Sequence, residues 1–127
     1  MSSQRSVLGK PLAPCSKVGM PTTGFNRDGK CGMSSGDKGL HHVCVKRVGR
    51  ADANFCTATG QPDWCSGMED WCVCEWAFDK AVERLGCDAL EVDCAATNAR
   101  ALEHYAALKP DAAAAACLRA KCPKPLD

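Results

Sequence analysis

The side chains in this sequence that could carry out chemistry are mainly cysteine thiols and histidine imidazoles. The 127 residues include 11 cysteines and three histidines. Thiolate and imidazole are the ligands that zinc prefers, and a tetrahedral site needs four of them. Six residues form a candidate metal or redox cluster: Cys15, Cys31, His41, Cys44, Cys72 and Cys74.

The spacing of these cysteines favours a different use. No two of them have the Cys-x₂-Cys spacing that is typical of structural zinc sites, and only one residue separates Cys72 from Cys74. We therefore expect disulfide bonds or buried packing thiols first. A zinc site, with zinc as the cofactor, is the alternative.

A thiol-dependent active site is a further alternative. In such a site a histidine acts as the base, a cysteine is the nucleophile and an aspartate orients the histidine. The candidates are His41 or His42, Cys44 or Cys72, and Asp37 or Asp28. In an extended strand His42 and Cys44 would share a face. The competing interpretation is a histidine that hydrogen-bonds to backbone where a strand begins, which leaves the catalytic residues unassigned.

Four further residues could line a pocket or belong to turns: Arg27, Asp28, Asp37 and Trp71. Arg27-Asp28-Gly29 is typical of a turn, because an aspartate there bonds its own backbone and glycine adopts a positive φ. Trp71 could line a ligand groove or a partner interface. Aromatic residues next to cysteines are, however, more often part of the core.

A small α+β fold must position these residues, and 127 residues suffice for a single domain, 1–127. Frequent glycine and proline predict an irregular, cysteine-containing N-terminal half over about 1–40. Alternation and β-branched residues predict a small sheet with strands at about 40–48, 70–75 and 89–95. The first two strands are expected to pair, which would bring Cys44, Cys72, Cys74 and His42 together on one face. Helical apolar spacing predicts helices at about 75–86, 97–108 and 110–121, packed against that sheet.

The helix boundaries rest on capping residues. Gly86 is expected at the end of the first helix, and Thr97 is expected to cap the second. Pro110 and Asp111 are good first-turn residues for the third helix. Residues 49–69 are expected to form a long loop, since they contain three glycines and a proline.

Charge and hydropathy narrow the classes of partner. With 16 basic and 15 acidic residues the formal net charge is +1, so we expect no binding to nucleic acid. No apolar run approaches the ~18 residues of a membrane-spanning helix. The first residues lack the apolar segment of a secretory signal, which predicts an intracellular protein, cytoplasmic or organellar. The high cysteine content instead favours a disulfide scaffold.

Several motifs occur in an order that resembles one known family. They are Val7-Leu8-Gly9, Pro21 to Cys31, Asp37 to Cys44, Asp70-Trp71-Cys72-Val73-Cys74 and Ala96-Thr97. In combination they resemble domain of unknown function 2237, a family of small proteins found largely in bacteria. The resemblance spans nearly the whole chain. It implies no established activity, substrate or cofactor.

By this comparison five cysteines match the family pattern: Cys15, Cys31, Cys44, Cys72 and Cys74. The other six are additions and candidate structural disulfide cysteines: Cys56, Cys65, Cys87, Cys94, Cys117 and Cys122. Six is an even number, as three extra disulfides would produce. The segment before Asp70 also lacks a Gly-Asn-Asp-type motif of the family, so a family binding site there could be lost or altered.

The sequence supports three functional hypotheses. The first is a small cysteine-rich, non-catalytic binding or assembly module with a protein partner, as an accessory subunit of a larger complex. The balanced charge and the lack of a convincing catalytic constellation motivate it. The second is a zinc-type metal-binding protein, and the third is a thiol-dependent enzyme or redox protein.

Overall fold

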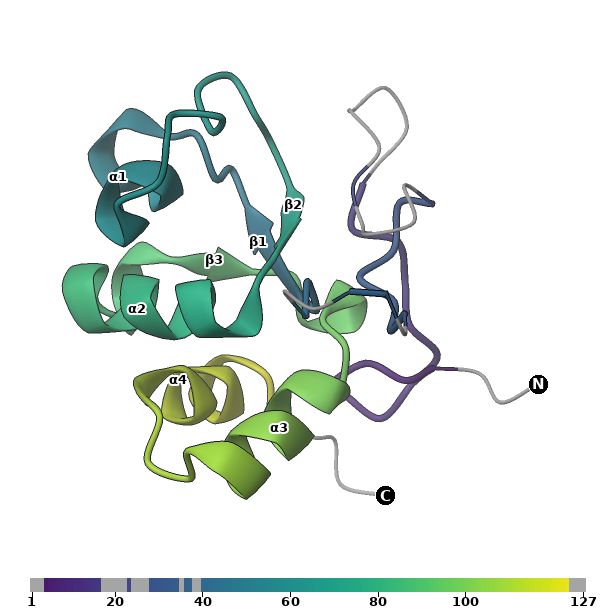
Figure 1. The fold of residues 1–127 in the computed structure, drawn as a ribbon. Coiled ribbons are helices and arrows are strands. Elements are labelled where there is room, and N and C mark those ends of the chain that lie inside the picture. Colours follow the sequence, from purple (N-terminus) through teal and green to yellow (C-terminus); the bar gives the residue numbers. More distant parts are fainter. Residues whose placement is uncertain (1–3, 17–22, 24–27, 35, 38–39, 124–127) are drawn as a thin grey trace.

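The computed structural model describes residues 4–16, 23, 28–34, 36–37 and 40–123. Figure 1 shows a small sheet with helices on one side and an irregular N-terminal segment on the other. The strands are β1 (Val43–Lys46), β2 (Trp71–Val73) and β3 (Glu91–Val92). The helices are α1 (Phe55–Thr59), α2 (Glu75–Leu85), α3 (Arg100–Leu108) and α4 (Ala113–Lys121), with short 3-10 turns at Ala51–Ala53, Cys87–Ala89 and Cys94–Ala96. The α+β prediction is confirmed.

The sheet is antiparallel, with the strand order β2-β1-β3. Cys44 lies opposite Cys72, and Val45 lies opposite both Trp71 on β2 and Val92 on β3. Since side chains alternate along a strand, this register turns the valines of β1 to one face and Cys44 to the other. The expected pairing of the first two strands is confirmed.

The valine face forms the main core. Val43, Val45 and Val73 are buried there, together with the side chains of α2 and α4 (Figure 1). Helix α2 contributes the apolar stripe Phe78, Ala81 and Val82, and Gly86 ends it at a φ of 89°. The predicted extent of this helix is therefore confirmed within one residue.

The opposite face of the sheet is covered by the N-terminal segment. Ala13 donates its N–H to the carbonyl of Ala95 at 2.9 Å, and Cys72 donates its N–H to Thr23 Oγ1 at 2.9 Å. These bonds replace the regular ladder that the segment lacks, because buried backbone groups need partners. The irregular N-terminal half is thus fixed to the sheet by individual bonds and, as shown below, by disulfides.

The strands are shorter than predicted. Leu40 and Arg47 have left-handed backbones, with φ values of 54° and 51°, and these interrupt the extended conformation on both sides of β1. The strand predicted at about 89–95 contains only Glu91–Val92, since 3-10 turns occupy Cys87–Ala89 and Cys94–Ala96. Alternation in the sequence was sound evidence for a strand but could not reveal these turns.

Two helices begin later than predicted. Thr97 does not cap α3: its hydroxyl donates to the Asp93 carbonyl and accepts the Cys44 N–H. Asn98 Oδ1 accepts the Arg100 N–H instead, at 2.9 Å. Helix α4 begins at Ala113, after a turn that contains Pro110.

The long loop expected at 49–69 contains a helix, α1. Asn54 caps its start by accepting the Thr57 N–H at 3.1 Å, and Gly60, at a φ of 69°, ends it. The available signal was Asn54 and Gly60, which directly flank the five residues of this helix. In the described part of the chain, no helix is both long and apolar enough to span a membrane.

Candidate functional site

The first candidate site is the cysteine face of the sheet. Cys44 on β1 lies opposite Cys72 on β2, but their sulfur atoms are not bonded to each other. Cys44 forms a disulfide with Cys15 (S–S 2.08 Å), and Cys72 forms one with Cys31 (S–S 2.03 Å). All four residues are buried, and in this oxidised form their sulfurs are neither thiolate ligands nor nucleophiles.

The six additional cysteines form three more disulfides with one another. The pairs are Cys56–Cys65, Cys87–Cys117 and Cys94–Cys122. All 11 cysteines lie in the described part of the chain, and Cys74 is the only free one among them. Cys74 is partly exposed and directly precedes α2.

The histidine next to this face is not paired with a thiol. His42 is fully buried, and its Nδ1 lies 2.6 Å from Glu75 Oε2. Its Nε2 has no hydrogen-bond partner in the described structure, so Cys74 does not bond to it. The register of β1 and β2, continued by one residue, places Cys74 opposite His42. The expected convergence on one face thus brings the backbones together without forming a thiol–imidazole hydrogen bond.

His41 has a different carboxylate partner. Its Nδ1 lies 2.7 Å from Asp37 Oδ1, and its backbone N–H donates to Asp37 Oδ2 at 2.8 Å. Burial acts to raise the pKa of Asp37, but the hydrogen bonds and charge of His41 outweigh it, so the pKa lies below its ordinary value. The candidate orienting aspartate therefore contacts a candidate base, while Cys44 and Cys72 remain in disulfides.

The remaining sequence candidates are placed in turns and packing. Asp28 accepts the Lys30 N–H at 3.0 Å and Gly29 has a φ of 86°, which is the chemistry of a turn. Arg27 lies outside the described residues. Trp71 is half-buried with its ring centroid 6.1 Å from that of Trp64, so it belongs to an aromatic cluster at the edge of the core.

A second polar site, which no local pattern indicates, is formed by His42, Glu75 and His104. Glu75 is the first residue of α2, and His104 lies on α3. His104 Nδ1 is 2.9 Å from Glu75 Oε1 and 2.8 Å from Oε2, so both imidazoles face one carboxylate. The two rings are stacked with their centroids 5.8 Å apart. We call these three residues the His–Glu–His cluster.

The His–Glu–His cluster is deeply placed. The side chains of His42 and Glu75 are fully buried and that of His104 is 26% exposed. Tyr105 is also fixed here, because its hydroxyl donates to the Glu75 carbonyl. Burial, together with the nearby Glu75 charge, raises the pKa of Tyr105, so it stays a neutral donor. A buried carboxylate with two imidazoles can hold a proton or a metal ion.

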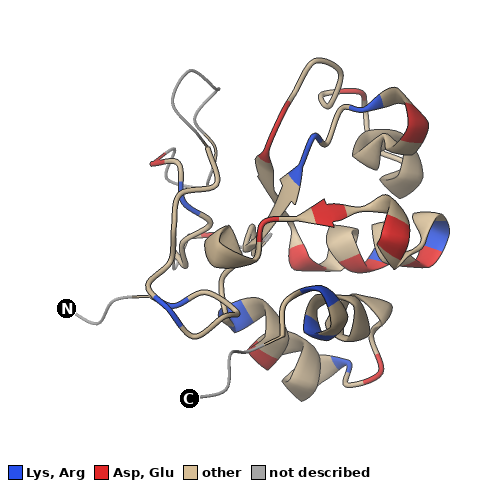
Figure 2. Cartoon of the chain, turned by 180° about the vertical axis from the view of Figure 1, so that it is seen from behind, with Lys and Arg blue, Asp and Glu red and all other residues tan. Residues whose placement is uncertain are grey.

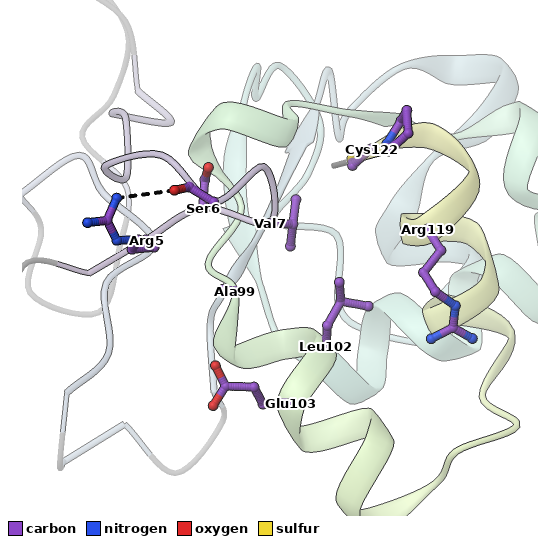
Figure 3. Close-up of a pocket in the computed structure, with 10 residues that line it drawn as sticks. Arg5, Ser6, Val7, Ala99, Leu102, Glu103, Arg119 and Cys122 are labelled. Carbon is purple, nitrogen blue, oxygen red and sulfur yellow. Dashed lines mark hydrogen bonds between the residues drawn. The ribbon is translucent and has the colours of Figure 1, made fainter. Parts of the chain in front are cut away.

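A cavity of about 690 Å³ forms a third candidate site, where the N-terminal loop meets α3 and the end of α4. Figure 3 shows Val7 and Leu102 in its middle, with Arg5 and Arg119 on opposite sides. Its volume is in the range of ligand pockets, which are about 300–1,000 Å³. We call this cavity the α3–α4 pocket.

The walls of the α3–α4 pocket are held by backbone bonds and a disulfide. Val7 donates its N–H to the Thr97 carbonyl, and Ala99 donates its N–H to the Arg5 carbonyl, both at 2.9 Å. The Cys94–Cys122 disulfide holds the end of α4. The pocket is therefore preformed, which lowers the entropy cost of binding.

A family model described as "Uncharacterized protein conserved in bacteria (DUF2237)" matches residues 5–110. The chain belongs to this family. The DUF2237 match contains both strands of the cysteine face and the whole His–Glu–His cluster. It ends before α4, so the Arg119 and Cys122 side of the α3–α4 pocket lies beyond the DUF2237 region. A search of curated proteins found no match.

Proposed function

We propose that this protein is a non-catalytic binding module, an accessory subunit whose α3–α4 pocket receives a segment of a partner protein. The observation that carries the proposal is the pocket itself: about 690 Å³, preformed and lined by Val7, Ala99 and Leu102. An apolar hollow of this kind with a few charged groups is the usual form of a binding site.

The charges around the pocket favour an acidic segment. Arg5 and Arg119 both line it. The one carboxylate in the lining, Glu103, is already paired with Arg100 at 3.0 Å. In Figure 2 basic segments of the N-terminal loop, α3 and α4 lie in this part of the molecule. An apolar side chain next to a carboxylate would therefore complement the pocket.

The disulfides support a particular setting for this function. Ten of the 11 cysteines form disulfides in the structure. Disulfides persist mainly in oxidising compartments. We therefore expect the protein to meet its partner in an oxidising compartment, and the sequence-based expectation of an intracellular protein would then apply to an oxidising organelle.

The test compares two leucines of the same helix. Leu102 lines the pocket, whereas Leu108 is 69% exposed and lies outside it. Leu102→Glu should reduce co-purification of a specific protein at least about 10-fold, which corresponds to ~1.4 kcal/mol. Leu108→Glu should leave it unchanged. The readout is quantitative mass spectrometry of proteins that co-purify from the source cells, with thermal unfolding as a check on folding.

Two results would contradict the proposal. One is equal recovery of every co-purifying protein with wild type, Leu102→Glu and Leu108→Glu. The other is a small molecule retained in the wild-type pocket, seen by native mass spectrometry and absent from Leu102→Glu. That outcome would make the protein a small-molecule binder.

A further inference from the structure

We infer that the His–Glu–His cluster is a binding site for a divalent transition-metal ion of the zinc type. The inference goes beyond the proposed binding function and does not depend on it, because the cluster is separate from the α3–α4 pocket. The ligands would be the Nδ1 atoms of His42 and His104 and the carboxylate of Glu75. They come from three parts of the fold: His42 directly precedes β1, Glu75 begins α2, and His104 lies on α3.

The donor set is one that such metals select. Two imidazoles and one carboxylate are known ligands of zinc and of non-haem iron, and they leave a coordination position for water. The three ligand atoms lie within 4.8 Å of one another. His104 is partly exposed, which gives an ion and its water a route to the cluster.

The distances require only a small adjustment. Glu75 Oε2 lies 2.6 Å from His42 Nδ1 and 2.8 Å from His104 Nδ1, the spacing of hydrogen bonds. Ligands that are each about 2.0–2.1 Å from a tetrahedral ion lie roughly 3.3 Å apart. The His104–Glu75 contact must therefore lengthen by about 0.5 Å and the His42–Glu75 contact by about 0.7 Å. His104 can provide its part of this movement, since its side chain is not fully buried, while the His42–Glu75 contact must lengthen within the core.

The proton positions must change when the ion binds. A ring that now donates from Nδ1 to Glu75 must carry its proton on Nε2, so that the Nδ1 lone pair faces the metal. His42 Nε2 has no acceptor among the described residues. Because outer hydrogen bonds of ligating histidines matter about 10–100-fold for affinity, we expect weaker binding than in a complete structural zinc site.

His41 provides a matched control. It also has Nδ1 on a carboxylate, at 2.7 Å from Asp37 Oδ1, but no third metal-binding side chain within the described residues joins that pair. The chain has only three histidines. His41→Gln therefore removes an equivalent imidazole–carboxylate pair without touching the cluster.

The experiment titrates the full chain with Zn²⁺ alone, without reductant so that the disulfides stay intact. We expect one ion per chain by native mass spectrometry and calorimetry, and a higher Tm when Zn²⁺ is present. His104→Gln, at the most exposed ligand, should lower the affinity at least 10-fold and abolish the rise in Tm. His41→Gln should bind like wild type. Co²⁺ in place of Zn²⁺ should give a visible absorption band that is lost in His104→Gln.

Three outcomes would overturn the inference. The first is the absence of 1:1 binding by the wild-type chain. The second is equal weakening by His41→Gln and His104→Gln, which would indicate adventitious surface binding. The third is binding that occurs only after reduction, which would assign the ion to cysteine thiolates.

Discussion

At the scale of single residues, the three histidines show how strongly the surroundings decide a side chain's role. His41 and His42 are neighbours, yet His41 is 40% exposed and bonds to Asp37, while His42 is buried against Glu75. Helix α3 supplies His104 to the same Glu75. Consecutive side chains thus have different roles: one is a half-exposed partner of a buried aspartate, and the other belongs to a buried cluster.

Asp37 provides a prediction about pH. Its pKa lies below the ordinary value of 3.8, so its ionised form stabilises the fold above that pH. The contribution is lost as the pH falls through the lowered pKa. Asp37→Asn should therefore reduce the free energy of unfolding by about 1–2 kcal/mol at pH 7, and by less as the pH falls below 3.8.

Urea denaturation at pH 7 and pH 3 measures this difference. Asp88→Asn is the control, because Asp88 is an exposed aspartate in the 3-10 turn Cys87–Ala89. A penalty for Asp37→Asn that is the same at both pH values would show that the charge of Asp37 does not matter.

Gly49 is expected to be intolerant of any side chain. A Cβ at this position would lie 1.9 Å from the Cys65 carbonyl oxygen, so one of two backbones would have to shift. Gly49→Ala should cost at least about 1–3 kcal/mol. At Gly32 the nearest atom to an added Cβ is 3.5 Å away, an ordinary contact. Gly32→Ala should thus be close to neutral, within about 0.5 kcal/mol. Urea denaturation measures both variants, and equal unfolding midpoints for Gly49→Ala and Gly32→Ala would contradict this prediction.

At the scale of elements, sequence patterns predicted correctly those helices and strands whose signals lie in consecutive residues. Helix α2 was predicted because its apolar stripe and Gly86 are features of consecutive residues. The pairing of β1 with β2 followed from two strong strand patterns. Thr97 was misassigned because its hydroxyl is used by Cys44 and Asp93, and Cys44 is distant in sequence.

The candidate site was less predictable than the fold. The importance of the cysteine face was visible, but pairing of Cys15 with Cys44 and of Cys31 with Cys72 depends on the path of an irregular segment. Glu75 could be taken for an ordinary acidic residue of a first helical turn. Only the packing of α3 against α2 brings His104 to it, so no local pattern marks the cluster.

The disulfides that fix the N-terminal segment should contribute more than those within a loop. Cys31–Cys72 spans 41 residues and Cys56–Cys65 spans nine. Loop-closure entropy assigns about 3.9 and 2.6 kcal/mol to them. All four cysteines are buried, so the two double substitutions to alanine leave comparable small cavities.

We therefore expect Cys31→Ala/Cys72→Ala to unfold at lower denaturant concentration than Cys56→Ala/Cys65→Ala. Guanidinium denaturation of the oxidised proteins measures this. Greater loss from the Cys56 and Cys65 pair would mean that the N-terminal segment is held mainly by its hydrogen bonds to the sheet.

At the scale of the whole molecule, the described residues form a three-stranded sheet whose two faces are covered in different ways. Helices α2 and α4 share a core with the valine face, and the disulfide-bonded N-terminal segment covers the other face (Figure 1). The α3–α4 pocket forms where that segment returns to the helices. Because α4 lies beyond the residues that match DUF2237, the pocket combines residues within that match with residues beyond it.

The most direct test of the proposed function is site-specific photocrosslinking in the source cells. The photoreactive residue p-benzoylphenylalanine would replace Leu102 in the pocket or, as the control, Leu108 on the exposed part of α3. We predict one discrete crosslinked protein for the Leu102 position and none for Leu108. Equal crosslinking from both positions, or none from Leu102 in a correctly folded protein, would contradict the account.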